Sequence, residues 1–353
     1  MTIKKVKIGI LGSGHILGAH AAGFARLRES CEVVVAARKE SDHARIRSLL
    51  GDSVEIVSDY KQLLRRNDID AVDIILPHNL HVEVTIEAAK NGKHVLVEKV
   101  MARNVEECDA MIQACSEAGV MLTVGHDRRY DPDWQALKTI VDSGELGEVL
   151  FWKLEHNQNV VFPENSWIRK KDAIGGGAIM SCLTHQIDCL RWYGGEIANV
   201  VSMSKVEPSR MEGEVIGAVL AKMNSGALAL MSINWYTQSH DAPDGLWYEF
   251  THVTGTKGEA YYMSSRGTYV KIHEEQRLFE YDLRGKGGFK KAEAETDGLT
   301  GHQRLIEEWV KSLHGQPANI ITAGTDSRKT VEVAEAAYLS ERDEKVIHLP
   351  LVN

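Results

Sequence analysis

The first 125 residues alternate short apolar runs with helical patterns, and this alternation limits the fold more than any other feature of the chain. The apolar runs have the β-rich composition of strands that are buried on both faces of a sheet. Helical patterns of ordinary length separate them. Repeated strand–helix alternation predicts a doubly wound parallel sheet of the α/β class. The runs cover residues 6–11, 32–37, 71–76, 95–97 and 120–124.

After residue 125 the pattern changes to longer alternating strands joined by short turns such as Asn224-Ser225-Gly226. Strands of this kind favour an open, mostly antiparallel mixed sheet. We therefore predict an N-terminal dinucleotide-binding domain over residues 1–125 and an α+β domain for substrate binding and oligomerisation over residues 126–353. A length of 353 residues is consistent with two domains.

The composition narrows the possible function classes. A formal net charge of -9 argues against broad nucleic-acid binding, and no apolar run has the length needed to span a bilayer. The start, Met-Thr-Ile-Lys-Lys, leads directly into a strand without the apolar block of a signal peptide. The five cysteines are scattered and odd in number, so they outline neither a disulfide framework nor a zinc site. The expected compartment is the cytoplasm.

A glycine-rich turn joins the first strand to the first helix, with the sequence Gly-Ser-Gly-His-Ile from Gly12. Gly12 suits a tight turn, and Gly14 allows close approach of a pyrophosphate, which the following helix N-terminus also favours. The third glycine comes one residue late, because Leu17 holds its usual place. A plain strand–helix turn also uses glycine, but its position at the start of the βα series favours a dinucleotide site that includes His15 and Ile16.

The second strand ends in Arg38 and Lys39, where an NAD site would carry an acid for the ribose. Two cations suit the 2′-phosphate of NADP, so the sequence favours NADP over NAD, although surface cations commonly follow strands and Glu40 lies nearby. The third buried strand stops at Leu76 and Pro77, at the sheet edge that holds the glycine turn. Polar residues follow it that either line the cofactor or cap the next helix. They are His78, Asn79 and His81.

The fourth buried run, residues 95–97, ends abruptly in Glu98 and Lys99. In an open α/β sheet, ligands bind outside the carboxyl ends of the strands, so this lysine can face a site. Its amine suits proton transfer if burial or a neighbouring cation lowers its pKa toward neutrality. Taken alone, a lysine at a strand end more often meets only solvent. The neighbouring cofactor features are what favour a role in chemistry.

A second group of polar residues follows the three glycines at residues 175–177. Backbone N–H groups at such a helix start are accessible to a ligand. Ser181, His185 and Asp188 are spaced four and three residues apart, so they share one face of a helix. His185 on its own fits a hydrogen-bonded core histidine equally well. The spacing fixes no metal ligand beyond His185 and Asp188, so no metal site is predicted.

Taken together, these motifs resemble the Gfo/Idh/MocA oxidoreductase family over nearly the whole chain. The motifs are the glycine turn with His20, the segment 77–81, Glu98-Lys99 and the helix that carries His185-Gln-Ile-Asp188. The resemblance implies an N-terminal Rossmann domain and a C-terminal open mixed sheet. It also implies oxidation or reduction of secondary alcohols of sugars and cyclitols with NAD(P).

The resemblance also implies roles for single residues. The Glu-Lys-Pro motif of the family corresponds to Glu98-Lys99-Val100, with valine in place of proline. The catalytic lysine and histidine of the family correspond to Lys99 and His185. The aspartate four residues before that histidine corresponds to Ser181, so a neutral group replaces a carboxylate. Glu98 and Lys99 are also expected to contact the cofactor.

The implied reaction is hydride transfer between nicotinamide and a secondary hydroxyl or keto group, with Lys99 or His185 as the base. Which of the two is the base stays open. Ser181 and Asp188 are expected to hold the substrate. Three more residues are expected to contact the substrate, because they follow the last strand of the first domain or precede the triple glycine. They are His126, Arg128 and Arg169.

Two other functions stay open. One is redox-neutral glycoside cleavage or epimerisation, in which a tightly held NAD(P) takes up a hydride and returns it. The other is a non-catalytic dinucleotide-sensing protein, which Val100 and Ser181 would favour and which the retention of Lys99 and His185 opposes. Exposed faces of open sheets commonly pair, so a homodimer or homotetramer is expected.

Overall fold

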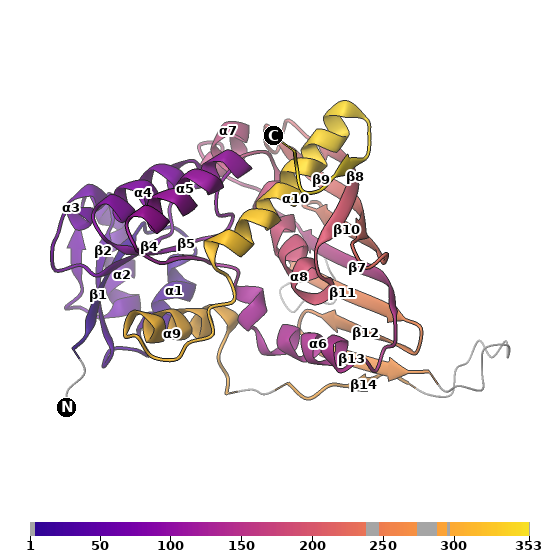
Figure 1. The fold of residues 1–353 in the computed structure, drawn as a ribbon. Coiled ribbons are helices and arrows are strands. Elements are labelled where there is room, and N and C mark those ends of the chain that lie inside the picture. Colours follow the sequence, from indigo (N-terminus) through magenta and orange to yellow (C-terminus); the bar gives the residue numbers. More distant parts are fainter. Residues whose placement is uncertain (1–3, 238–246, 274–287, 295–296, 353) are drawn as a thin grey trace. The chain divides into compact units, whose positions relative to one another are not determined.

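The computed structural model of the chain forms two compact units (Figure 1). Within the described part of the chain, every helix is too short or too polar to cross a bilayer. Unit 1 comprises residues 1–130, 172–175 and 299–331, and unit 2 comprises residues 131–171, 176–298 and 332–353. The structure describes residues 4–237, 247–273, 288–294 and 297–352.

Unit 1 contains a six-stranded sheet in which all neighbouring strands are parallel, in the order β3-β2-β1-β4-β5-β6. The predicted doubly wound sheet is therefore confirmed. The strand order reverses between β1 and β4, and sheets of this kind bind ligands beyond the carboxyl ends of the strands at that point. The strands are β1 (Val6–Leu11), β2 (Cys31–Ala36), β3 (Glu55–Val57), β4 (Ala71–Ile74), β5 (His94–Val97) and β6 (Leu122–Val124).

Helices alternate with these strands, as the sequence pattern predicts. In α5, the Asn104 side chain accepts the N–H of Glu107 and caps the helix, and apolar residues three to four positions apart are buried. Cys108 and Cys115 belong to that buried stripe. The helical elements are α1 (Leu17–Phe24), η1 (Glu40–Asp42), α2 (His43–Leu50), α3 (Tyr60–Leu64), α4 (His78–Lys90), α5 (Val105–Glu117) and η2 (Asp127–Tyr130).

A helix from far along the chain, α9 (Gly301–Leu313), completes unit 1 and lies beside α1 (Figure 1). The side chains of Thr300 and Gln303 form a capping box at its start. The two helices approach closely at Gly23, where an added Cβ would lie 2.7 Å from Cδ1 of Ile306. Four apolar residues of α9 belong to the core of unit 1, and one of them is Val310. The other three are Leu305, Ile306 and Trp309.

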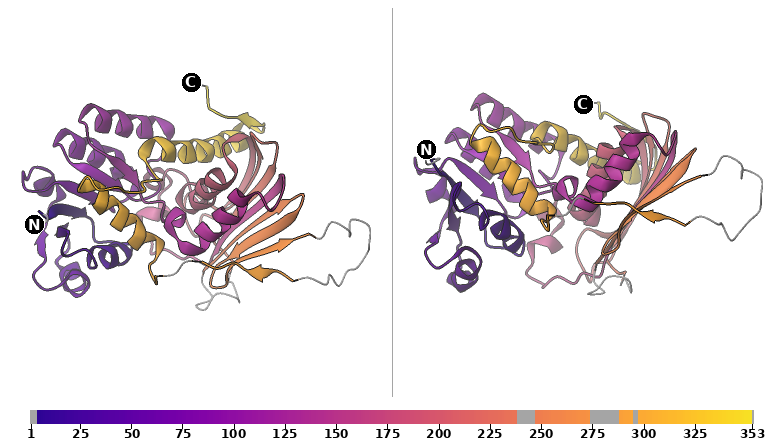
Figure 2. Two further views of the ribbon diagram at one scale, coloured as in Figure 1. Left: turned by 60° about the horizontal axis from the view of Figure 1, so that its bottom comes forward. Right: turned by 90° about the horizontal axis from the view of Figure 1, so that it is seen from below.

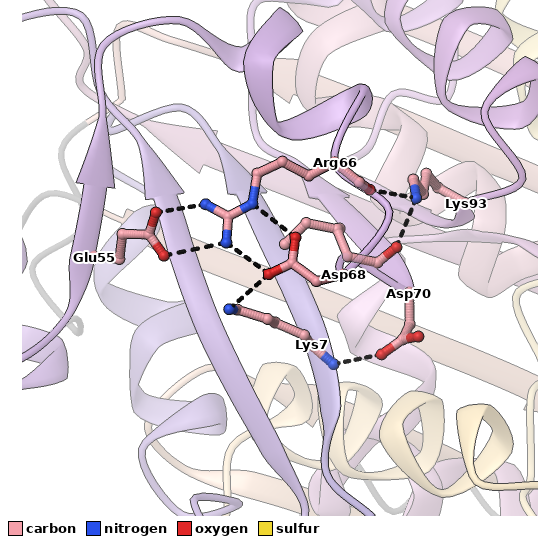
Figure 3. A network of polar contacts seen from close by, with 7 residues as sticks. Lys7, Glu55, Arg66, Asp68, Asp70 and Lys93 are labelled. Atoms are coloured by element: carbon pink, nitrogen blue, oxygen red, sulfur yellow. Dashed lines mark hydrogen bonds and ion pairs between the residues drawn. The ribbon is translucent and has the colours of Figure 1, made fainter.

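An ion-pair network holds the amino ends of the strands in unit 1 (Figure 3). The guanidinium of Arg66 contacts Glu55 at the start of β3, and its Nη2 lies 2.7 Å from Oδ2 of Asp68. The same carboxylate oxygen is 2.9 Å from Nζ of Lys7 in β1. Nζ of Lys93, just before β5, donates to the carbonyl oxygen of Arg66 at 2.8 Å. These contacts stabilise the edge of the sheet opposite to the one where ligands are expected.

Unit 2 contains a nine-stranded sheet in the order β14-β13-β12-β11-β7-β10-β9-β8-β15. Only β7 and β10 pair in parallel among these strands, so the predicted open, mostly antiparallel mixed sheet is confirmed. The strands are β7 (Val149–Gln158), β8 (Ile197–Val206), β9 (Glu214–Met223), β10 (Leu228–Asn234), β11 (Trp247–Gly255), β12 (Gly258–Met263), β13 (Gly267–Ile272), β14 (Lys290–Lys291) and β15 (Ile347–His348).

Helices of unit 2 cover one face of this sheet, with α8 against β7 and α6 against β12 and β13 (Figure 2). Along β7, Trp152, Leu154 and His156 are buried, whereas Lys153 and Glu155 between them are partly exposed. This is the alternation expected of a half-covered sheet. The remaining helical elements are α6 (Pro132–Ser143), η3 (Trp167–Arg169), α7 (Lys171–Ile174), the π-helical turn η4 (Ile179–Leu183), α8 (Thr184–Gly194) and α10 (Gly324–Asp343).

Candidate functional site

The turn after β1 has the shape that binding of a dinucleotide phosphate requires. Gly12 has a φ of +122°, and an added Cβ there would lie 2.7 Å from the carbonyl oxygen of Ile75, so a larger residue would strain the turn. A Cβ added to Gly14 would meet no atom within 4 Å. The N–H groups of Gly14, His15 and Ile16 donate to no described residue, and α1 begins directly after them. Backbone N–H groups and a helix N-terminus can therefore hold an anion here.

Charged residues from the segment after β2 surround this turn. Oγ of Ser13 donates to Oδ2 of Asp42 at 2.5 Å, and Nη2 of Arg45 donates to the carbonyl oxygen of Gly14 at 2.9 Å. The two cations at the end of β2 are exposed, and they are Arg38 and Lys39. The sequence analysis missed Asp42 and Arg45, because a ribose-binding residue is expected directly at the strand end and both residues lie several positions beyond it.

His81 of α4 links the turn after β4 to the segment after Lys99. It is fully buried, with Nε2 2.8 Å from the carbonyl oxygen of Leu76 and Nδ1 2.9 Å from that of Val100. Burial lowers the pKa of this imidazole, so the ring is neutral near pH 7. Pro77 stands just before α4, and the Lys99–Val100 peptide bond is cis.

His78 is also buried, and its Nδ1 lies 3.1 Å from the carbonyl oxygen of Ile174. Burial and the neighbouring His81 lower the pKa of His78 to about 3, so this ring is neutral too. Asn79, next along α4, is half-buried. The structure thus surrounds the histidines with backbone carbonyl groups, and the cofactor contacts expected of all three residues stay predictions.

The carboxylate of Glu98 is buried at the end of β5 between two histidines. Nε2 of His20 lies 2.8 Å from Oε1 of Glu98, and Nε2 of His302 lies 3.7 Å from the same oxygen. The other oxygen, Oε2, accepts the backbone N–H of Lys99 at 3.1 Å. Gly125 makes room for this carboxylate, since an added Cβ there would lie 2.8 Å from Oε1. Both oxygens of Glu98 are therefore held in place.

Each of these histidines also faces a second carboxylate. Nδ1 of His20 lies 2.8 Å from Oδ2 of Asp73, and Nδ1 of His302 lies 3.1 Å from Oδ2 of Asp127. Nη1 of Arg128 is 2.5 Å from the same oxygen of Asp127. Three carboxyl groups thus face three groups that can carry a positive charge. We call this set the buried ion cluster, and its members are His20, Asp73, Glu98, Asp127, Arg128 and His302.

The pKa values of this cluster favour two imidazolium ions. Burial is the largest single effect and lowers the pKa of His20, but the charges and hydrogen bonds of Asp73 and Glu98 together raise it to about 10. In the same way, Asp127 and Glu98 overcome burial and raise the pKa of His302 to about 9. Burial raises the pKa of Glu98, yet the two imidazoles hold it well below its usual range. The contribution of the two histidines to folding stability is complete below their unfolded-state pKa of 6.5 and is lost as the pH rises through about 9 to 10.

In unit 2, the three residues predicted on one helical face lie on consecutive helical elements. Ser181 belongs to the π-helical turn η4, whereas His185 and Asp188 belong to α8. All three side chains are buried. The spacing of polar residues predicts a regular α-helix and gives no sign of the π turn. Such turns are rare and occur frequently at functional sites.

His156 of β7 lies beside His185, with parallel rings whose centroids are 6.2 Å apart. Its Nδ1 is 3.0 Å from Oε1 of the buried Glu249, an ion-pair distance outside hydrogen-bond geometry. Nε2 of Gln186 donates to the same oxygen at 3.2 Å. The sequence analysis missed His156 and Glu249. The available signal was a polar residue at an inward-facing position of an alternating strand.

The segment that carries Ser181 is held by Tyr338 and Glu214. The hydroxyl oxygen of Tyr338 accepts the N–H groups of Gly177 at 3.0 Å and Met180 at 3.1 Å, and the hydroxyl donates to Oε1 of Glu214 at 2.8 Å. Burial raises the pKa of Glu214 above its usual value. These long-range contacts were also missed, because their partners come from distant parts of the chain.

The other residues predicted to bind substrate lie in different surroundings. His126 is buried after β6, and Arg128 belongs to the buried ion cluster. Arg169 of η3 donates from Nη2 to the carbonyl oxygen of Ser209 at 3.0 Å. Within unit 1 the structure thus brings Glu98 and Arg128 into one cluster. Within unit 2, Ser181, His185 and Asp188 follow one another along η4 and α8.

Known proteins resemble both parts of the chain. Residues 6–126 match the model of an oxidoreductase family with an NAD-binding Rossmann fold, and residues 134–261 match the GFO/IDH/MocA C-terminal domain. Over 277 residues the chain is 31% identical to the uncharacterized oxidoreductase YrbE of Bacillus subtilis, which covers 76% of this chain and 77% of that protein.

Two further proteins are similar over most of their length. Myo-inositol 2-dehydrogenase of Thermotoga maritima is 27% identical over 276 residues, which cover 77% of this chain and 79% of that protein. Among solved structures, levoglucosan dehydrogenase in complex with NADH and levoglucosan matches 99% of this chain and 100% of that chain with a TM-score of 0.84. Its sequence identity of 21% means that the match shows a shared fold.

Proposed function

This chain belongs to the Gfo/Idh/MocA oxidoreductase family, and from that premise we propose that it transfers a hydride between NAD(P) and a secondary hydroxyl or keto group of a sugar, glycoside or cyclitol. One observation carries the proposal. A glycine turn with free N–H groups and the Glu98-Lys99 pair both stand at carboxyl ends of strands of one parallel sheet. The similarity to a myo-inositol 2-dehydrogenase supports a polyol substrate.

We assign the cofactor to unit 1, and three of the proposed substrate contacts, Ser181, Asp188 and Arg169, belong to unit 2. The glycine turn would hold the pyrophosphate through backbone N–H groups, since an added Cβ at Gly12 would collide with the neighbouring strand and Gly14 faces open space. When bound, the nicotinamide supplies the hydride chemistry. The segment after β4, with Leu76, Pro77 and Asn79, would border the bound dinucleotide, and His78 and His81 would support it through their backbone contacts.

In the proposed reaction, the substrate hydroxyl gives its proton to the amine of Lys99 or the imidazole of His185 as the carbon-bound hydrogen leaves. Ser181 and Asp188 would orient the substrate through hydrogen bonds, with Arg169, His126 and Arg128 as further contacts. Lys99 belongs to unit 1 and His185 to unit 2.

A spectrophotometric screen of sugars, glycosides and inositols with NAD and NADP in parallel tests the function, with myo-inositol as the first probe. Sustained formation of NAD(P)H supports a dehydrogenase. Product formation without net reduction of the cofactor would favour redox-neutral cleavage or epimerisation instead. Dinucleotide binding without any product would favour a sensing protein.

The Lys99→Ala variant tests the role of that residue. We expect turnover to fall by roughly 10²-fold or more, as is typical for the loss of acid–base help, while the dinucleotide Kd changes little. Lys90→Ala is the matched control, because Lys90 is an exposed lysine of α4 in the same unit. Near-normal turnover of Lys99→Ala would remove Lys99 from the mechanism.

The preference for NADP over NAD is a finer part of the proposal. Arg38 and Lys39 are exposed at the end of β2, and Arg45 adds a third cation beside the glycine turn, which favours a 2′-phosphate. Asp42 is the opposing feature, because a carboxylate near the turn suits the ribose hydroxyls of NAD. Its hydrogen bond with Ser13 already occupies one oxygen of that carboxylate.

A homodimer or homotetramer is also part of the proposal, supported by the face of the unit 2 sheet that the helices leave uncovered. Strand register places Val201 opposite Leu220 and Leu220 opposite Leu230 on that face. Met203 is 76% exposed and Leu220 is 49% exposed. A contiguous apolar face of this kind suits burial against a second copy of the chain.

A cytoplasmic location completes the proposal. The five cysteines are free, and four of them are buried, which fits a reducing compartment.

A further inference from the structure

The buried ion cluster connects a distant helix to Lys99 in a few steps. His302 stands in the first turn of α9, and its Nε2 approaches Oε1 of Glu98. His20 holds the same oxygen from the other side. The second oxygen of Glu98 accepts the backbone N–H of Lys99. The carboxylate therefore lies between the two imidazoles and the backbone of the residue to which we assign proton transfer.

A metal ion is the competing explanation for this cluster. One ligand atom each from His20, Glu98 and His302 lies within 4.8 Å of the others. However, every ring nitrogen of the two histidines faces a carboxylate oxygen of Asp73, Glu98 or Asp127. Such surroundings favour protons on all four nitrogens, and a metal could bind only after displacing two of those protons. The cluster is satisfied as a set of ion pairs.

We propose that His302 is a positioning residue for Lys99, acting through the carboxylate of Glu98. The inference rests on the proposed function, because it assumes that Lys99 takes part in the reaction. His20 holds Oε1 of Glu98 at 2.8 Å and His302 approaches the same oxygen at 3.7 Å, so the two histidines together restrict the carboxylate more than His20 does alone. Restricting Glu98 restricts the backbone N–H of Lys99 as well, and small displacements of a reacting group are costly for turnover.

The proposal predicts a pH dependence. The charged groups that face His302 are Asp127 and Arg128 from η2, Glu98 after β5 and His20 from α1. The imidazolium of His302 loses its proton as the pH rises through about 9, and its attraction for Glu98 then disappears. Turnover is expected to decline on that alkaline side. The side chain in His302→Gln has no such proton to lose, so the alkaline decline in turnover that His302 causes should disappear from the pH–rate profile of that variant.

The test compares His302→Ala and His302→Gln with His314→Ala. His314 stands at the opposite end of α9, and its Nε2 lies 2.9 Å from the carbonyl oxygen of Ser30. We expect kcat of His302→Ala to fall by roughly 10- to 100-fold with the KM for the dinucleotide nearly unchanged. His302→Gln keeps a donor and should recover part of the loss. His314→Ala should keep the wild-type kcat. The substrate is the compound that gives the highest rate in the screen above.

A second readout needs no substrate. Reductive ¹³C-methylation gives each lysine an NMR signal, and the Lys99→Ala variant identifies the signal of Lys99. We expect His302→Ala to shift that signal and His314→Ala to leave it in place.

A third readout uses the double variant. In a Lys99→Ala background, His302→Ala should cause no further loss of kcat, because both residues act on the same step.

The outcomes separate the two proposals. Normal turnover of Lys99→Ala would refute the role of Lys99, whatever His302 does. A large loss in Lys99→Ala together with turnover of His302→Ala within twofold of wild type would refute the role of His302 alone. One equivalent of a transition metal in the purified protein, lost in His302→Ala, would replace the positioning role with a metal site.

Discussion

Removal of the Tyr338 hydroxyl tests directly what holds the segment of unit 2 that carries Ser181, a proposed substrate contact. In Tyr338→Phe, the N–H groups of Gly177 and Met180 lose an acceptor, and the buried carboxylate of Glu214 loses a donor. Each buried polar group that loses its partner costs about 1–3 kcal/mol. Oε1 of Glu214 keeps the backbone N–H of Ile179 as a donor at 2.9 Å, so the loss comes mainly from the two N–H groups and the lower part of the range applies. We expect a total loss of about 3 kcal/mol.

For a domain of this size, 1 kcal/mol changes Tm by about 2–4 °C, so Tyr338→Phe should lower Tm by about 6–12 °C. Tyr193→Phe is the matched control, because it also removes a tyrosine hydroxyl. That hydroxyl donates a hydrogen bond to the carbonyl oxygen of Trp134 at 3.1 Å. Its expected cost is about 1 kcal/mol. Differential scanning calorimetry of both variants measures the difference. A fall in Tm for Tyr338→Phe no larger than that for Tyr193→Phe would show that the three bonds do not hold the segment.

Two further predictions concern the cofactor and the assembly. Arg38→Asp should weaken NADP binding by 10-fold or more, on the order of one lost phosphate ion pair, and should change NAD binding far less. Arg47→Asp on α2 is the control and should change the binding of neither cofactor. Equal changes for both cofactors, measured by fluorescence titration, would contradict the NADP preference. Met203→Asp on the uncovered sheet face should shift the protein toward monomers in sedimentation velocity. Leu150→Asp places the same charge on the opposite side of the sheet and should leave the distribution unchanged. Identical distributions for the two variants would argue against that face as the contact.

The parts of the fold that depend on local patterns could be predicted from the sequence. Continuous apolar runs predicted five of the six strands of unit 1, and glycine at positions 12 and 14 predicted the turn between β1 and α1. The missed strand is β3, which has only three residues and starts with an exposed glutamate. These features depend on a few consecutive residues, whose side chains and backbone preferences act over one or two turns of chain. The change to alternating strands after residue 125 predicted the second kind of sheet for the same reason.

The contacts of the candidate site could be predicted only in part, because they join residues that are distant in sequence. His302 stands in a segment with the pattern of an ordinary amphipathic helix, and nothing near it indicates that its imidazole meets Glu98. The π turn at Ser181 has no local sign either, because its sequence Ile-Met-Ser-Cys-Leu suits a regular helix. Such pairs are decided by tertiary packing, which single-residue preferences do not encode.

The packing of α9 against α1 has a consequence for the order in which the protein is made. A ribosome releases the six strands of unit 1 early, but α9, which packs against α1 and completes their core, is translated long after them. Until residues 301–313 emerge, the nascent sheet keeps an apolar surface open to chaperones or to other chains. A fragment cut at residue 130 would carry every strand of that sheet and still lack its lid, so it would not serve as a minimal nucleotide-binding module.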